Sequence, residues 1–146
     1  MSNKYKFSHS SLNKLDGVHP KLVKVVKKVM GLQVMDFLIA EGLRTPGVQE
    51  IYVLTGRSKT MNSKHLIQDD GFAHAVDLYP YPINMQKVNR GEVKEYIRFG
   101  ILAGLMKAMG KQEGVNIIWG GDWDSDGLTS DTGFFDAPHF QIDLRL

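Results

Sequence analysis

Apolar and polar positions along this chain repeat with two different periods, which predict helices in some segments and strands in others. From residue 20 to residue 32, apolar side chains recur at helical spacing with lysines opposite, and Pro20 suits a first helical turn. From Glu92 to Lys111, apolar residues recur at four-residue intervals, and Gly110 can end the helix. We expect the apolar stripe of this second helix to pack in the core; it comprises Ile97, Ile101, Leu105 and Met109, with Met106 beside it.

Shorter apolar segments predict strands at residues 36–43, 73–79, 116–119 and 138–144. A short helix is expected over residues 49–54, starting near Pro46. The chain has 146 residues, of which 42% are apolar, and this is enough for one packed core. We therefore predict an α+β fold, in which residues 1–146 form a small single domain with helices packed on a central antiparallel sheet and a cleft on the sheet face.

Strand alternation orients the polar residues of two predicted strands. The apolar residues of segment 138–144 share one face, so His139 projects from the other face, toward a cleft or solvent. In segment 73–79, Asp77 and His74 lie on opposite faces by the same rule. We therefore expect that His74 does not join Asp77 at one metal ion.

Composition limits the chemistry and the partners. The chain has no cysteine, which excludes disulfides, a cysteine nucleophile and cysteine-bound zinc. Eighteen basic and sixteen acidic residues give a formal charge of +2, so we expect no nucleic acid partner. One local basic cluster is either a solvated helix face, the commoner outcome, or a surface for an anionic polymer; it contains Lys21, Lys24, Lys27 and Lys28.

No segment approaches the ~20 apolar residues of a membrane span. The basic residues near the N-terminus are not followed by an apolar run, so we expect neither membrane insertion nor a signal peptide.

Two histidines and two aspartates carry the candidate chemistry. His65, Asp77 and His139 can hold one zinc ion and leave its fourth position to water, as a hydrolytic zinc site requires. Asp136, three residues before His139, is a candidate proton carrier, although an aspartate in a turn before a strand often only caps that turn. No H-E-x-x-H helix is present, which excludes thermolysin-like catalysis.

These residues lie within ordered blocks that resemble the LAS-type zinc peptidases. That family includes D-alanyl-D-alanine carboxypeptidases and the L-alanyl-D-glutamate endopeptidases that phages use as endolysins. The blocks are Glu41-Gly42-Leu43-Arg44-Thr45 with Gln49, Thr60 to His65, His74 to Leu78, Trp119 to Trp123, and Phe135 to Phe140.

The resemblance implies that His65, Asp77 and His139 are the zinc ligands, Asp136 the catalytic carboxylate, and Arg44 the substrate-polarising residue. Arg44 would stabilise the oxyanion or bind a carboxylate of the stem peptide, and its alternative role is a surface salt bridge. Two residues would have supporting roles or be ordinary hydrogen-bonding residues: Ser63, in the loop that carries His65, and Gln49, which would hold Arg44.

The resemblance implies a monomeric zinc endopeptidase that cuts the L-alanyl-D-glutamate bond of the peptidoglycan stem peptide and acts as a phage endolysin in host lysis. Such a protein would be made as a soluble product in the host cytoplasm and would reach the wall after export or membrane permeabilisation. One alternative is a D-alanyl-D-alanine carboxypeptidase or dipeptidase of the same family. Another is a non-catalytic wall-binding domain whose zinc is structural.

Two features depart from this pattern. Residues 66–76 form a longer insert than the family often has between the first histidine and the aspartate, and we expect it to affect the rim of the cleft. The segment from Asp122 to Gly127 has the D-x-D-x-D-G spacing of a calcium loop, with Gly133 where an EF-hand needs glutamate. Its candidate calcium ligands are Asp122, Asp124, Asp126 and Asp131; a solvated acidic turn is the alternative.

Overall fold

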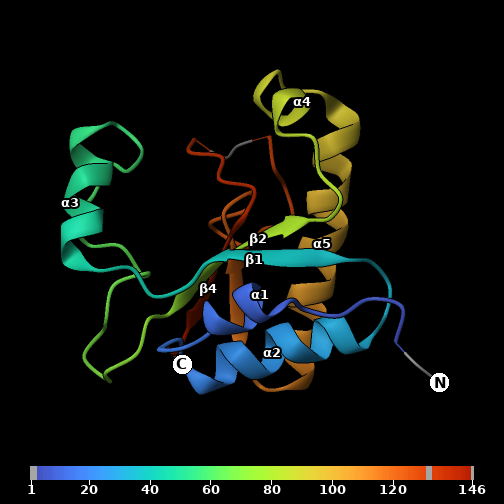
Figure 1. Cartoon of the computed structure of the whole chain (residues 1–146), viewed down its shortest axis with the longest axis horizontal. Coiled ribbons are helices and arrows are strands. Elements are labelled where there is room, and N and C mark those ends of the chain that lie inside the picture. The colour runs from blue at the N-terminus through green and yellow to red at the C-terminus, as the bar shows by residue number, and fades with distance from the viewer. Residues whose placement is uncertain (1–2, 131–132, 146) are drawn as a thin grey trace.

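A four-stranded antiparallel sheet lies at the centre of the molecule (Figure 1), with the strand order β1-β2-β4-β3. The computed structural model describes residues 3–130 and 133–145. The strands are β1 (Phe37–Glu41), β2 (Ala75–Pro80), β3 (Asn116–Trp119) and β4 (His139–Asp143). The predicted α+β class and antiparallel sheet are therefore confirmed, and the predicted strands differ only at their ends.

Three of the helices were predicted from their sequence patterns: α2 (Pro20–Gly31), α3 (Pro46–Leu54) and α5 (Val93–Gln112). The first turn of α3 is capped by the Thr45 hydroxyl, which accepts a hydrogen bond from the backbone N–H of Val48 at 3.2 Å. Two further helices, α1 (His9–Asn13) and α4 (Met85–Asn89), were not predicted, because five residues are too few to show a helical period.

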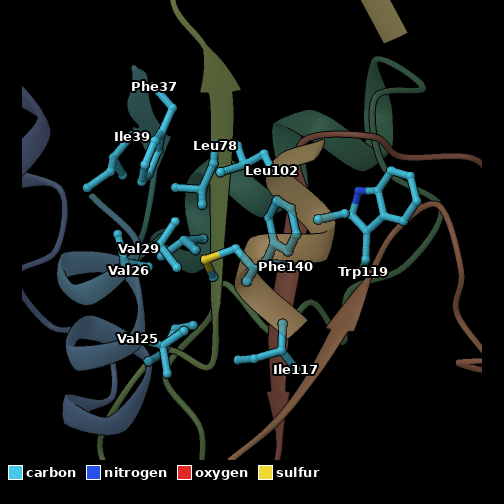
Figure 2. Close-up of a cluster of buried hydrophobic side chains, with 14 of the residues drawn as sticks. Val25, Val26, Val29, Phe37, Ile39, Leu78, Leu102, Ile117, Trp119 and Phe140 are labelled. Carbon is cyan, nitrogen blue, oxygen red and sulfur yellow. The ribbon is translucent and has the colours of Figure 1, made fainter. Parts of the chain in front are cut away.

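The hydrophobic core lies between the sheet and the helices α2 and α5 (Figure 2). Val25, Val26 and Val29 of α2 face Leu78 and Phe140 of the two central strands, and all five side chains are almost fully buried. Burying such a side chain contributes about 1.5–3 kcal/mol. The helices thus cover one face of the sheet, and the polar residues of β2 and β4 lie on the other.

The predicted core stripe of α5 is partly wrong. Ile97 and Ile101 are exposed, with 55% and 48% of their surface accessible, whereas Met106 and Met109 are buried as predicted. Positions four apart advance by 400° around a helix of 3.6 residues per turn, so a strict four-residue repeat winds off the buried face. The buried face follows alternating steps of three and four instead, through Phe99, Leu102, Met106 and Met109, and Ala103 lies beside Leu102 on the same face.

A β-bulge near the end of β1 changes the face on which Glu41 lies. Ile39 pairs with Leu78 and Glu41 pairs with Asp77, so two residues of β1 are matched by one residue of β2. In a regular strand Glu41 would share the core face with Ile39. The extra residue, Ala40, places Glu41 beside Asp77 on the polar face instead.

Helix α3 stands apart from α2 and α5 (Figure 1). It follows β1 directly, and the long segment after it leads back to β2. Within residues 3–130 and 133–145, no helix is long and apolar enough to cross a membrane.

Candidate active site

A cleft of about 510 Å³ opens on the polar face of the sheet. Its side chains come from the end of β1, from α3 and the loop that follows it, from β2, and from the segment that leads into β4. His65, Asp77, Asp136 and His139 all line this cleft. The chain therefore brings together four residues that are spread over more than seventy positions of the sequence.

His65, Asp77 and His139 form a compact group whose possible ligand atoms all lie within 4.8 Å of one another. Asp77 Oδ1 lies 3.2 Å from His65 Nε2 and 3.5 Å from His139 Nδ1. Tetrahedral zinc with bonds of about 2.0–2.1 Å places its ligand atoms roughly 3.3–3.4 Å apart. The spacing and the neutral-nitrogen and carboxylate donors therefore fit a zinc ion.

The remaining nitrogen of each histidine ring is held by a neighbouring oxygen. His65 Nδ1 lies 2.9 Å from the carbonyl oxygen of Gly42, and His139 Nε2 lies 2.9 Å from Oε1 of Gln141. When those nitrogens carry the protons, His65 Nε2 and His139 Nδ1 are free to bind a metal. Gln141 was not predicted to have this role, although its position two residues after His139 on one strand face is a usable signal.

Charge interactions stabilise the ionised form of Asp77. Burial would raise its pKa, but hydrogen bonds with His139 and His65 hold the pKa of Asp77 well below its usual range. Burial would likewise lower the pKa of His139, but its hydrogen bond with Asp77 and the charge of that carboxylate raise it. Asp77 is therefore a carboxylate at neutral pH, as a metal ligand must be.

The backbone fixes Asp136 at the edge of this group. Its N–H donates to the carbonyl oxygen of Gly120 at 2.8 Å, and its own carbonyl oxygen accepts from the N–H of His139 at 3.1 Å. A Cβ atom at Gly120 would lie 2.1 Å from the Asp136 carbonyl oxygen, so this approach requires glycine. Burial and the charge of Asp77 raise the pKa of Asp136, which suits a group that exchanges protons.

Arg44 is a buried residue, with 9% of its surface accessible, and not the surface salt bridge considered as an alternative. Its Nε and Nη2 donate to the two carboxylate oxygens of Glu41 at 2.5 and 2.8 Å. Its Nη1 donates to Oε1 of Gln49 at 2.6 Å and to Oγ of Ser63 at 3.5 Å. Glu41 was not predicted as a site residue, because regular alternation places it in the core.

Gln49 and Ser63 connect Arg44 to the rest of the cleft. Gln49 is fully buried, and its Nε2 donates to Oγ of Ser58 at 2.8 Å and to the carbonyl oxygen of Thr60 at 2.6 Å. Ser63 Oγ accepts from the backbone N–H of His65 at 3.1 Å. Both residues therefore have the kind of contact that a supporting role requires.

The insert at residues 66–76 turns away from the cleft. All of its residues are described, and none of them lines the cleft, contrary to the expectation that it shapes the rim. His74 Nε2 lies 2.7 Å from Asp70 Oδ2, and His19 Nε2 lies 3.6 Å from the same oxygen. His74 therefore belongs to a separate cluster that ties the insert to the start of α2, as the strand alternation suggested.

The acidic loop after β3 is organised around Asp122, which is buried. Asp122 Oδ2 accepts from Lys107 Nζ at 2.8 Å and from the N–H of Gly127 at 2.9 Å. Burial would raise the pKa of Asp122, but these contacts lower it to about 2. Carboxylate oxygens of Asp122, Asp124 and Asp126 lie within 4.8 Å of one another. The fourth candidate calcium ligand, Asp131, lies outside the described residues.

The two tryptophans have different surroundings. Trp123 lines the cleft, and its ring centroid lies 5.2 Å from that of His139. Trp119 is buried in the core, where its Nε1 donates to the carbonyl oxygen of Ala137 at 2.7 Å. Trp123 therefore belongs to the cleft, whereas Trp119 belongs to the core.

Comparison with known proteins identifies the family. The family model described as phage L-alanyl-D-glutamate peptidase matches residues 1–143. The chain is 28% identical to the L-alanyl-D-glutamate peptidase of Escherichia phage T5, over 94% of this chain and 98% of that protein. The crystal structure of the Serratia marcescens L-Ala D-Glu endopeptidase ChiX aligns with a TM-score of 0.72 and 27% identity, over 97% of this chain and 92% of that one. The chain therefore belongs to the phage L-alanyl-D-glutamate peptidase family.

Proposed function

We propose that this chain is a zinc-dependent endopeptidase that hydrolyses the bond between L-alanine and D-glutamate in the stem peptide of peptidoglycan. The main support is the group of His65, Asp77 and His139 on the floor of an open cleft, in a chain of this family. Three protein ligands are typical of catalytic zinc, whereas structural zinc usually has four. This ligand number argues against a wall-binding domain with structural zinc.

A bound zinc ion would polarise the scissile carbonyl and lower the pKa of its water toward ~7. Asp136 would take the proton of the attacking water and deliver it to the leaving amine of glutamate. Its backbone contacts with Gly120 and His139 fix its position, and its raised pKa favours both halves of this proton transfer.

Arg44 would supply fixed positive charge on one side of the cleft. Burial lowers the pKa of this guanidinium, but hydrogen bonds and charge from Glu41 raise it above its usual value, so the group stays charged. Because Glu41 and Gln49 hold its orientation, Arg44 can stabilise the developing oxyanion without rearranging.

Digestion of purified peptidoglycan, followed by mass spectrometry of the fragments, tests the proposed bond. An L-alanyl-D-glutamate endopeptidase leaves fragments that end in L-alanine and fragments that begin with D-glutamate. Release of D-alanine instead would identify the carboxypeptidase alternative. Absence of any hydrolysis by zinc-loaded protein would refute the enzymatic proposal.

Arg44→Lys should lower stability and activity despite retaining the charge. A lysine ammonium cannot bind both oxygens of Glu41 and also reach Gln49, so the buried Oε1 of Gln49 loses its donor. An unsatisfied buried group costs about 1–3 kcal/mol. Urea unfolding should show this loss, and Arg90→Lys is the matched control, because the Arg90 pair with Glu92 is exposed. Equal stability of the two variants would contradict the expected role.

Calcium binding at the acidic loop stays a prediction from sequence, since Lys107 already offsets the charge of Asp122. If calcium binds, titrating it into zinc-loaded protein should change both the amide signals of this loop and the hydrolysis rate. The double variant Asp124→Ala with Asp126→Ala should suppress both responses, whereas Asp69→Ala should suppress neither. Unchanged amide signals at millimolar calcium would show that the loop is a solvated turn.

A further inference from the structure

Positive charge along the cleft is distributed unequally between paired and unpaired side chains. Arg44 is matched by the carboxylate of Glu41, with which it makes two hydrogen bonds. Arg57 and Lys59 also line the cleft, and within residues 3–130 and 133–145 neither forms an ion pair with a carboxylate. These two residues of the loop after α3 therefore carry positive charge that the described protein does not neutralise.

Arg57 is held in place by an aromatic ring. Its Cζ lies 4.3 Å from the centroid of the Tyr52 ring, and Cζ of Arg44 lies 4.5 Å from the same centroid. Cation–π contact of this kind orients a guanidinium and leaves its N–H edge available. Tyr52 thus places the unpaired Arg57 next to the buried arginine network that adjoins His65.

Arg57 lines the same cleft as the proposed metal ligands His65, Asp77 and His139. A substrate that is cut at this group must lie in the cleft. The guanidinium of Arg57 is therefore available to a charged group of that substrate.

The proposed substrate needs such a cation. A glutamate residue has two carboxyl groups, and only one can be joined to the next residue of the peptide, so the other remains a free carboxylate close to the scissile bond. Asp136, which lines the same cleft, would repel this carboxylate when it is ionised. A planar guanidinium can bind it through two parallel hydrogen bonds, which an ammonium cannot do.

We propose that Arg57, held against Tyr52, binds the free carboxylate of the substrate glutamate and so selects acidic over amidated stem peptides. This inference rests on the proposed peptidase function. It makes Arg57 a specificity residue on the leaving-group side of the cleft.

Steady-state kinetics on two soluble peptidoglycan fragments test this assignment, one with the glutamate carboxylate free and one with it amidated. For the wild-type chain, amidation should lower kcat/KM by about 10- to 100-fold, the value of one charge-assisted contact. Arg57→Gln should lose a similar factor on the free-carboxylate fragment, mainly through KM, and should scarcely distinguish the two fragments. Lys59→Gln removes a charge from the same loop and should keep the wild-type preference.

Four results would overturn the assignment, and a fifth would overturn the proposed function itself. Arg57→Gln could lower kcat/KM equally for both fragments, which would indicate a structural or general electrostatic effect. It could also leave kcat/KM unchanged for both. Lys59→Gln could abolish the preference, which would place the carboxylate at Lys59. If the wild-type chain cleaves neither fragment nor whole peptidoglycan, the proposed function itself fails. If it cleaves both fragments equally well, only the role of Arg57 fails.

Discussion

Removal of any one proposed ligand should abolish zinc binding and, with it, hydrolysis. His65→Ala, Asp77→Ala and His139→Ala each leave two protein ligands, and zinc affinity depends on the full set of deprotonated donors. Zinc per chain, measured by elemental analysis after dialysis, should be about one for the wild type and close to zero for each variant. Chelation of the wild type should stop hydrolysis, and added zinc should restore it.

His74→Ala is the matched control for these variants. His74 also contacts an aspartate, at 2.7 Å, but in the separate cluster beside α2. The His74→Ala variant should therefore keep its zinc. Loss of zinc from His74→Ala combined with retention by Asp77→Ala would show that the proposed ligand set is wrong.

Zinc binding should also weaken as the pH falls. Asp77 raises the pKa of His139 in the metal-free protein, so at a pH below that value zinc must displace a proton from the ring. Calorimetric titrations at several pH values should show proton release that grows toward acidic pH. Zinc affinity that does not change between neutral and mildly acidic pH would contradict His139 as a ligand.

Asp136→Asn should keep zinc and the fold but lower turnover by at least ~100-fold, the lower range for loss of general acid–base assistance. Asparagine has nearly the shape of aspartate but cannot take up a proton from water at neutral pH. The backbone contacts with Gly120 and His139 do not depend on the side chain, so the loop should stay in place. Release of new amino groups from purified peptidoglycan gives the turnover, and elemental analysis gives the zinc content.

Asp69→Asn is a suitable control for Asp136→Asn, because Asp69 is an exposed aspartate in the insert that turns away from the cleft. It should retain wild-type turnover. If Asp136→Asn is also active within a few-fold of wild type, Asp136 has no part in proton transfer.

Much of the architecture follows from short sequence patterns. Strand alternation placed His139 on the face opposite the buried Phe140 and Ile142, and both of these are in the core. The same rule separated His74 from Asp77, because two strand residues an odd number of positions apart project from opposite faces. These inferences depend on local geometry, which the sequence records directly.

The parts that could not be predicted depend on contacts between distant segments. The carbonyl oxygen of Gly42 holds the ring of His65, but a backbone carbonyl has no residue-specific signature. Ile97 and Ile101 of α5 were wrongly predicted to be buried, because both side chains are apolar. Which side of a helix is buried depends on how the helix packs against the sheet.

The extra residue in β1, Ala40, divides this short strand into two parts with different roles. Before Ala40, side chains such as Ile39 belong to the core; after it, Glu41 belongs to the cleft, where it holds Arg44. Substitutions can therefore vary the two parts separately. If Ala40 paired with Asp77 in a regular ladder, the Glu41 carboxylate would turn toward the core and Arg44 would lose its partner. Deletion of Ala40 would instead join Ile39 directly to Glu41, and Ile39 would still face the core and Glu41 the cleft. Homologous or engineered sequences should accordingly accept either the bulge or a strand that is one residue shorter here.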